Sequence, residues 1–261
     1  MDRAPRNLAP NLWVIDRPFK LPYVGVEIGT RMTCIRLANG RLFLHSPVKL
    51  DPVLRNSLDA LGEVRAIVAP NKLHHLFVAE YVRSYPRTGA YSAPSLSKKR
   101  PDLPFTGELC DKPQTEWRGQ IEQHLFRGAP ALNEVVFFHP ATRTLILTDL
   151  AFNISKEAAK RSPLFYWLWD VGHFGPHRFV RLRGIRDRQA ARESVETILS
   201  WNLRPHNREP WRRTCDGCTQ PVRGRVRVPA PSMMRLCKMS PIVASRHAGA
   251  DVDQIRTRHQ S

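Results

Sequence analysis

The 261-residue sequence contains no apolar run approaching the roughly 20 residues that a membrane-spanning helix needs. Its first stretch, MDRAPRNLAPNLWVIDRPF, lacks the apolar centre and the small-residue cleavage site of a secretory signal. The five cysteines are odd in number and scattered, which favours reduced thiols over a disulfide framework. We therefore expect a cytoplasmic protein with no membrane partner.

The sequence also lacks a dense basic stripe, although its formal net charge is +18. From Arg204 to the end, 12 Lys and Arg stand against 4 Asp and Glu, so much of the excess lies in the last 58 residues. The rest is spread over the first 203 residues without clustering. Because nucleic-acid binding needs clustered positive charge, we do not expect a nucleic acid as partner.

The first 203 residues alternate apolar strand patterns with amphipathic helix patterns. Asp51 is placed to cap a helix whose first residue is Pro52, and Asp187–Trp201 carries its apolar residues on one side. Two β-rich halves that each carry helices predict an α/β protein of layered, αββα sandwich type. The expected strands are Leu12–Ile15, Met32–Leu37, Arg41–His45, Val64–Ala69, Gly89–Ser92, Ile121–Phe126, Glu134–Phe138 and Arg143–Thr148, and a further helix is expected over Leu76–Tyr85.

We expect the core of this sandwich to contain apolar residues from both halves. They are Leu44, Ile67, Val136, Leu145 and Leu147. After Leu203 the pattern is lost, because Pro, Arg, Met and Cys mix without a helical or strand period. The sequence therefore predicts a folded domain over residues 8–203 and a basic, disordered tail over residues 204–261. The pair Cys215 and Cys218 in this tail is an isolated half of a zinc-binding pattern, which is weak on its own.

Polar residues follow several predicted strands at the point where each strand ends. His45 ends one strand, His74 and His75 follow the next through the loop Pro-Asn-Lys-Leu, and Asp149 ends the last. Imidazole and carboxylate groups at such ends could bind a metal or transfer protons. The structural alternative is that one histidine packs under the sheet and that the other, like Asp149, caps a helix.

Three stretches resemble a family of unknown function within the metallo-β-lactamase-like superfamily. They are Leu-His-Ser-Pro at Leu44–Pro47, Ala-Pro-Asn-x-x-His-His-Leu-Phe at Ala69–Phe77, and Phe-Phe-His-x-x-x-x-Thr-Leu-Ile-x-Thr-Asp at Phe137–Asp149. The similarity runs from about residue 8 to residue 201. It implies an αββα sandwich of metallo-β-lactamase type with a site at one edge.

The superfamily's metal motif, His-x-His-x-Asp-His, is degenerate in this chain. With its last histidine on His75, the motif places His74 at the aspartate, Lys72 at the second histidine and Pro70 at the first. Asp149 matches the metal-bridging aspartate of the superfamily. A full binuclear zinc centre is therefore not expected.

The later Gly-His motif of the superfamily would fall at residues 128–134, which read GAPALNE and contain no histidine. At most one divalent metal (zinc, iron or manganese) is expected. The resemblance predicts one cleft in which each residue has a role. Its catalytic residues would be Asp149 and His75, its metal ligands His74, His75, Asp149 and His45, and its orienting residues Asn71 and Glu134.

Two functions from different classes are compatible with these residues. The first is a metal-dependent hydrolase with a degenerate or mononuclear site, acting on a small-molecule ester, thioester or phosphoester. The second is a non-catalytic binding or structural descendant of the fold. Whether the chain is an enzyme stays open at this point, because a fold does not determine activity.

The C-terminal tail departs from the ending that the resemblance implies. Members of the family end the final helix with Trp-x-Phe-Asp-Arg-Ile-Ile, followed by a strand and His-Gly-Asp. Codons compatible with Arg204–Cys215, read one nucleotide later, encode Asp-Arg-Ile-Ile-Val-Ser-His-Gly-Asp-Val-Leu. We therefore predict a frameshift near Leu203, with a missing or altered last strand and the loss of a histidine from the site.

Overall fold

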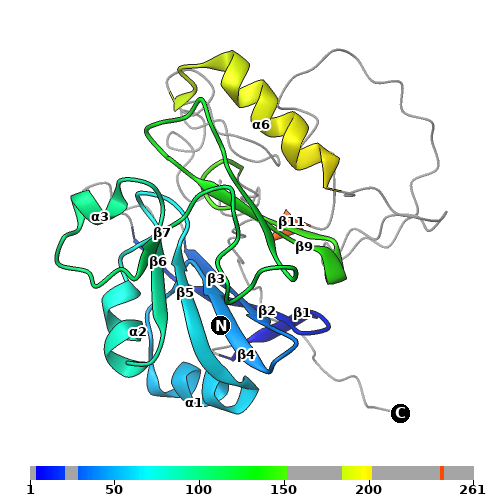
Figure 1. The fold of residues 1–261 in the computed structure, drawn as a ribbon. Coiled ribbons are helices and arrows are strands. Elements are labelled where there is room, and N and C mark those ends of the chain that lie inside the picture. Colours follow the sequence, from blue (N-terminus) through cyan, green and yellow to red (C-terminus); the bar gives the residue numbers. More distant parts are fainter. Residues whose placement is uncertain (1–3, 21–28, 152–183, 202–241, 244–261) are drawn as a thin grey trace, which may run out of the picture.

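The computed structural model describes residues 4–20, 29–151, 184–201 and 242–243. The described residues form two sheets. The first has the order β1-β2-β3-β4-β5-β6-β7 (Figure 1), and the second has the order β11-β10-β9-β8. Within the first sheet β1 to β4 pair antiparallel, whereas β4 to β7 run parallel. The first sheet comprises β1 (Arg6–Ala9), β2 (Leu12–Arg17), β3 (Thr30–Arg36), β4 (Arg41–His45), β5 (Glu63–Ala69), β6 (Gly89–Ser92) and β7 (Gly107–Glu108).

The second sheet is built from later parts of the chain, and its strands β8 to β10 pair antiparallel. Its members are β8 (Glu122–Leu125), β9 (Val135–His139), β10 (Thr144–Ile146) and β11 (Ile242–Val243). A short 3-10 helix, η1 (Pro140–Thr142), connects β9 to β10. The helices are α1 (Pro52–Leu61), α2 (Val78–Ser84), α3 (Leu96–Lys99) and α6 (Arg188–Ser200).

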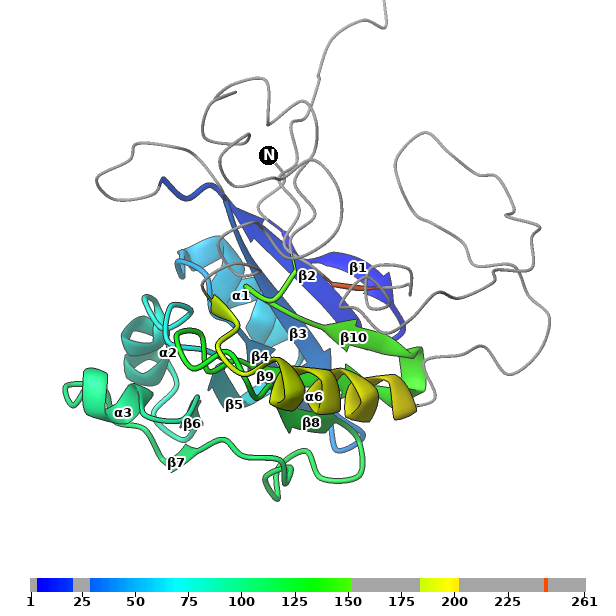
Figure 2. The same cartoon turned by 90° about the horizontal axis from the view of Figure 1, so that it is seen from above.

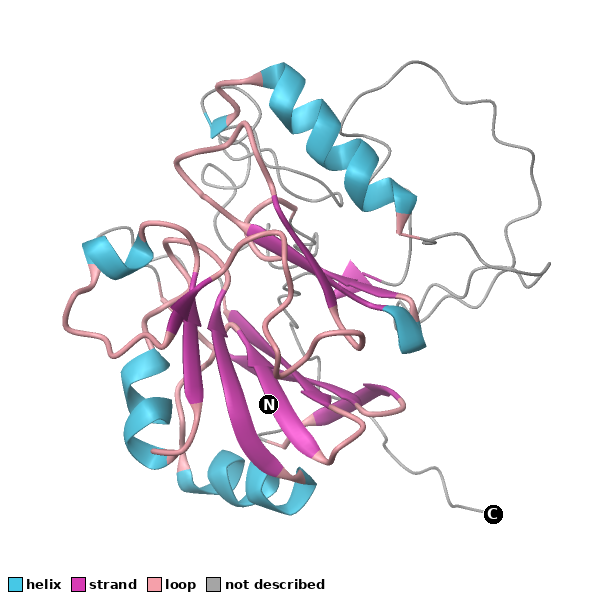
Figure 3. Cartoon of the chain, viewed as in Figure 1, coloured by secondary structure: helices cyan, strands magenta, loops and turns pink. Residues whose placement is uncertain are grey.

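Three buried clusters establish the layer order. One packs the first sheet against α1 and α2, through residues such as Leu44, Leu54 and Tyr81. A second joins the two sheets, where Phe43 meets Phe137 with ring centroids 5.6 Å apart. The third packs the outer face of the second sheet against α6 (Figure 2). The sequence of layers is helix, sheet, sheet, helix, which confirms the predicted αββα sandwich (Figure 3).

The predicted core residues are buried as expected. Leu44, Ile67 and Val136 are fully buried, and Leu145 and Leu147 are nearly so. Asp51 caps α1 as predicted, because its carboxylate accepts the backbone N–H of Leu54 at 2.8 Å.

The predicted tail over residues 204–261 lies outside the described residues except for Ile242 and Val243. These two residues pair parallel with β10 as β11. No helix in the described part of the chain is both long and apolar enough to cross a membrane.

Candidate functional site

The loop after β5 joins the two sheets between the carboxyl ends of β4 and β5 and the start of β9. The backbone N–H of Val135 in β9 donates to the carbonyl of Pro70 at 2.8 Å, and that of Lys72 donates to Leu132 at 3.2 Å. On the other side, the N–H of Ser46 donates to the carbonyl of Val68 at 2.9 Å. These bonds bring the ends of β4 and β5 to the start of β9.

Glu134 holds the loop that follows β10. It is 1% exposed, and its carboxylate accepts the backbone N–H groups of Thr148 at 2.7 Å, Asp149 at 2.8 Å and Leu150 at 3.1 Å. Burial and the negative charge of Asp149 raise the pKa of Glu134, against the opposing hydrogen bonds from Thr148. Glu134 thereby fixes the position of Asp149.

Asn71 connects this loop to the histidine turn. Its fully buried amide donates to the carboxylate of Asp149 at 2.7 Å and to the hydroxyl of Thr148 at 2.9 Å, and lies 3.3 Å from Glu134. The amide oxygen accepts the N–H groups of Leu73 at 2.8 Å and His74 at 2.9 Å. One side chain is therefore hydrogen bonded both to the backbone of His74 and to the carboxylate of Asp149.

His74 lies at the centre of the site. Its Nε2 is 3.3 Å from Asp149 Oδ2, and its Nδ1 is 2.6 Å from Ser46 Oγ. Burial would lower the pKa of His74, but the charges of Asp149 and Glu134 outweigh it and raise that pKa above its ordinary value. The imidazole thus bridges a carboxylate and a hydroxyl.

Ser46 is the site residue that sequence reasoning missed. It directly follows β4, is 2% exposed and has a φ of 58°, a left-handed conformation that is uncommon outside glycine. The signal was available, because Leu44–Pro47 is one of the three stretches that carry the family resemblance. Within that stretch only His45 has a side chain that titrates near neutral pH, so the sequence points to His45 and not to Ser46.

His45 packs beneath the site. Its ring meets Phe137 edge-on with centroids 5.2 Å apart, and its Nε2 is buried with no hydrogen-bond partner among the described residues. Burial, with the adjacent charge of His74, lowers the pKa of His45 to about 3. His45 is therefore a neutral imidazole at physiological pH.

The side chain of His75 has a different partner from that of His74. His75 Nδ1 lies 2.9 Å from the Arg100 guanidinium, just beyond α3. Burial and the positive charges of Lys99 and Arg100 lower the pKa of His75 to about 4. The side chains of consecutive residues in a tight turn point in different directions. His74 therefore contacts Asp149, whereas His75 contacts Arg100.

The donor set does not fit the superfamily's metal centre. Among the described residues, no group of three or more His, Cys, Asp or Glu side chains is arranged to hold a metal ion. Both ring nitrogens of His74 are already engaged, and Glu134 is committed to backbone N–H groups. That leaves one histidine and one carboxylate together, which is fewer than the three protein ligands of a catalytic zinc site.

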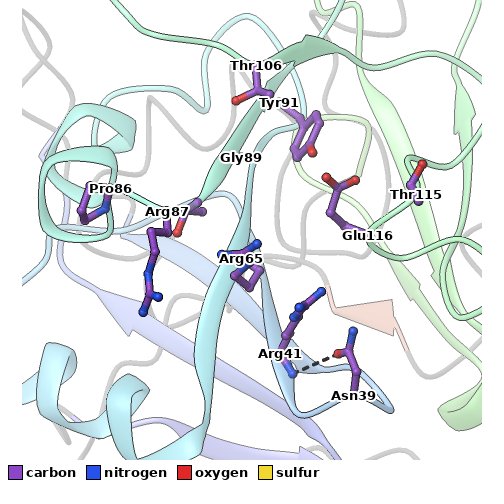
Figure 4. A pocket seen from close by; sticks show the side chains of 11 residues that line it. Asn39, Arg41, Arg65, Pro86, Arg87, Gly89, Tyr91, Thr106, Thr115 and Glu116 are labelled. Atoms are coloured by element: carbon purple, nitrogen blue, oxygen red, sulfur yellow. Dashed lines mark hydrogen bonds between the residues drawn. The ribbon is translucent and has the colours of Figure 1, made fainter.

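A separate pocket of about 510 Å³ lies at the opposite ends of the parallel strands (Figure 4). Arg41 and Gly89, which begin β4 and β6, line it together with Arg65, Tyr91 and Glu116. It contains none of the predicted site residues. The site residues predicted from the sequence therefore lie outside this pocket, and the candidate site is the one around His74.

Comparison with known families gives a match over residues 10–164 to the domain of unknown function DUF4336. The match covers more than half of the chain. The chain belongs to this family. A search of curated proteins gives no match to this DUF4336 member.

Solved structures similar to this DUF4336 member include metallo-β-lactamases. The structure of VMB-1 has 9% sequence identity and a TM-score of 0.50, over 77% of this chain and 99% of that one. The metallo-β-lactamase from Pontibacter korlensis has 12% identity and a TM-score of 0.48, over 76% and 97%. The one from Hirschia baltica has 12% identity and a TM-score of 0.46, over 58% and 72%. The family member has the metallo-β-lactamase type of fold, and identities this low bear on the fold alone.

Proposed function

We propose that this DUF4336 member is a hydrolase of a small-molecule substrate in which His74, oriented by Asp149, accepts and returns the proton. The observation that carries this proposal is the imidazole of His74, which bridges the carboxylate of Asp149 and the hydroxyl of Ser46. A histidine held in this way is the usual general base of enzymes that work near neutral pH.

The surrounding residues support a preorganised site. Asn71 and Glu134 fix Asp149 and the histidine turn through buried hydrogen bonds, so little reorganisation is needed when the proton moves. His45 contributes a neutral ring beneath the site and therefore adds no competing positive charge. Small-molecule chemistry fits this geometry better than nucleic-acid binding, because the site's polar groups are largely buried.

A mononuclear metal hydrolase would need His74, Asp149 and a third donor. His45 is the candidate, because its buried Nε2 has no hydrogen-bond partner among the described residues. However, these three side chains do not form a group arranged to hold a metal ion in the described part of the chain. We therefore derive no step of the reaction through a metal.

A non-catalytic binding or structural descendant is the second candidate. The observation that favours it is Glu134, whose carboxylate is occupied by backbone N–H groups and so stabilises the loop after β10. In this alternative, the polar cluster would contribute only to folding. Activity of the purified protein decides between the two candidates.

The test is hydrolysis of p-nitrophenyl acetate, a short-chain thioester and p-nitrophenyl phosphate by the full chain, with its metal content measured and with or without a chelator. We expect hydrolysis of at least one substrate that survives the chelator and falls roughly 100-fold or more in His74→Gln. The matched control is His75→Gln, which should retain activity because His75 contacts Arg100 instead.

Two results would contradict the proposal. Activity lost on chelation and restored by zinc would favour the mononuclear metal hydrolase. No hydrolysis of any substrate by a folded protein would favour the non-catalytic descendant.

A further inference from the structure

The hydroxyl of Ser46 lies where His74 can remove its proton. Both nitrogens of the imidazole are engaged, Nε2 by Asp149 and Nδ1 by Ser46. Within the described part of the chain, Ser46 therefore supplies the nucleophile that this base can activate. We infer that Ser46 is a catalytic nucleophile, with His74 as its base and Asp149 as a positioning residue, for carboxylic esters or thioesters. The inference rests on the proposed function and deepens it.

The direction of the two hydrogen bonds at His74 supports its role as the base that deprotonates Ser46. A neutral imidazole carries one proton, and the carboxylate of Asp149 at Nε2 favours that proton on Nε2. Nδ1 is then left with its lone pair, 2.6 Å from Ser46 Oγ. The serine O–H therefore donates to His74, which is the arrangement needed for proton removal.

This relay uses the two ring nitrogens in the reverse sense to the common serine hydrolases, where the serine meets Nε2 and the aspartate meets Nδ1. The chemistry is unchanged, because either nitrogen of imidazole accepts a proton while the other remains hydrogen bonded. Such sites are recognised by geometry and roles, not by residue order.

The backbone at Ser46 indicates a constrained position. Its φ of 58° costs free energy for a residue with a Cβ, and strained conformations of this kind concentrate at functional sites. The strand β4 ends directly before it, and its N–H is fixed on the carbonyl of Val68 at 2.9 Å. The loop then leads to α1, so the serine lies on a turn between a strand and a helix, as nucleophilic serines of other hydrolases do.

Two other buried nucleophilic side chains of the described residues, Ser92 and Cys34, differ from Ser46 in their surroundings. Ser92 ends β6 and is fully buried, but its Oγ has no hydrogen-bond partner among the described residues. Cys34 lies in the core, where burial raises the pKa of its thiol to about 12 and keeps it protonated. Ser46 is distinguished from both by its contact with His74.

The reaction balances with water as the second reactant. Ser46 Oγ attacks the carbonyl carbon, and its proton passes to His74 Nδ1. The bond from that carbon to the leaving oxygen or sulfur breaks as His74 returns the proton to the leaving group. Water, deprotonated by His74, then attacks the acyl-serine, which releases the carboxylic acid and restores the Ser46 hydroxyl.

Exposure limits the size of the substrate. Ser46 is 2% exposed, whereas the side chains of His74 and Asp149 are 19% and 12% exposed. A substrate therefore approaches past the imidazole, and small acyl groups suit this path. The half-exposed side chains of Leu73 and Leu76 flank the two histidines and favour an apolar acyl group.

The test is covalent labelling of the full chain by diisopropyl fluorophosphate, read by intact mass and peptide mapping. The expected result is one added diisopropylphosphoryl group on Ser46, formed as the P–F bond breaks and fluoride leaves. Labelling should be abolished in Ser46→Ala and slowed about 100-fold or more in His74→Gln. Ser92→Ala is the matched control and should be labelled at the wild-type rate.

Asp149→Asn tests the positioning role separately. It should slow labelling and move the pH midpoint of labelling downward, because a neutral amide no longer stabilises protonated His74. A label on any other residue, or no label on folded wild-type protein, would overturn the inference. Ester hydrolysis without modification of Ser46 would overturn the nucleophile while leaving the proposed function intact. Labelled Ser46 without hydrolysis of any substrate would support the nucleophile and contradict the proposed function.

Discussion

At the scale of single residues, the protonation of His74 controls the proposed chemistry. The charged and titratable groups that face it are Asp149, Glu134 and the neutral His45. Since the carboxylates raise the pKa of His74 and the base acts in its neutral form, activity is absent below that pKa and rises as the pH passes through it. We predict a hydrolysis profile whose lower limb has its midpoint above the ordinary histidine value. A midpoint below that value in the wild-type protein would contradict the arrangement.

The stability of the site depends most on Glu134. Glu134→Gln replaces one acceptor oxygen with an NH2 group that faces backbone N–H donors, so we expect a loss of about 2 to 4 kcal/mol in the free energy of unfolding. Urea denaturation measures this loss. The control is Glu193→Gln on the exposed face of α6, which should change stability by less than about 0.5 kcal/mol. Equal effects of the two substitutions would show that the buried network does not hold the loop.

The sequence located most of the site residues, because the carboxyl ends of neighbouring strands meet at one edge of a sheet. Asn71 and Asp149 follow predicted strands and Glu134 begins one, and the structure brings these three residues together with His74. The choice between His74 and His75 could not be made, because it depends on the direction each side chain takes in the turn. The contact between Ser46 and His74 spans 28 residues, and no local pattern indicates it.

At the scale of elements, α6 is attached to the second sheet through the loop after β8. The carbonyl of Gly128 accepts the N–H of Arg186 at 2.8 Å, and the N–H of Arg127 donates to the Ser194 hydroxyl at 2.9 Å. Gly128 has a φ of 85°, and a Cβ there would lie 2.8 Å from the backbone nitrogen of Ala191. The helix therefore approaches so closely that only glycine fits at this position.

Gly128→Ala should therefore destabilise the protein by roughly 3 to 5 kcal/mol, through backbone strain and the displacement of α6. Gly119 offers a matched control, because its φ of 78° is similar but nothing lies within 4 Å of the added Cβ. Gly119→Ala should cost only about 1 to 2 kcal/mol of conformational strain. Thermal unfolding of both variants measures the difference, and equal losses would show that the contact with α6 contributes nothing.

The bounds of β10 and α2 differ from the predicted ones at the ends where side chains of the site form hydrogen bonds with the backbone. The last predicted strand, Arg143–Thr148, stops at Ile146 because the N–H groups of Thr148 and Asp149 bind Glu134 and not a neighbouring strand. The helix predicted from Leu76 begins at Val78, since the preceding residues form the turn organised by Asn71. The periodicity of apolar residues therefore predicts which helices and strands form and how they are layered. The exact residues at which β10 and α2 begin or end depend on polar contacts between distant parts of the chain.

At the scale of the whole molecule, the predicted frameshift concerns the edge of the second sheet that lies beside β10. In the described part of the chain, β10 is followed in space by β11, which is two residues long. A closing strand encoded in the shifted frame after Leu203 would supply a longer partner for this edge and a histidine near the site. We predict that resequencing the gene across codons 204 to 215 gives a shifted frame that encodes Ile-Ile followed by His-Gly. If the shifted frame does not encode this sequence, the frameshift prediction is wrong and the tail is a genuine extension of the protein.

The central claim is that Ser46, His74 and Asp149 act together as a hydrolytic site without a metal centre. It is tested most directly by a crystal structure of the full chain after treatment with diisopropyl fluorophosphate. The account predicts a phosphoryl group bonded to Ser46 Oγ, with His74 still bridging toward Asp149. An unmodified Ser46, with a metal ion bound between His74 and Asp149, would contradict it.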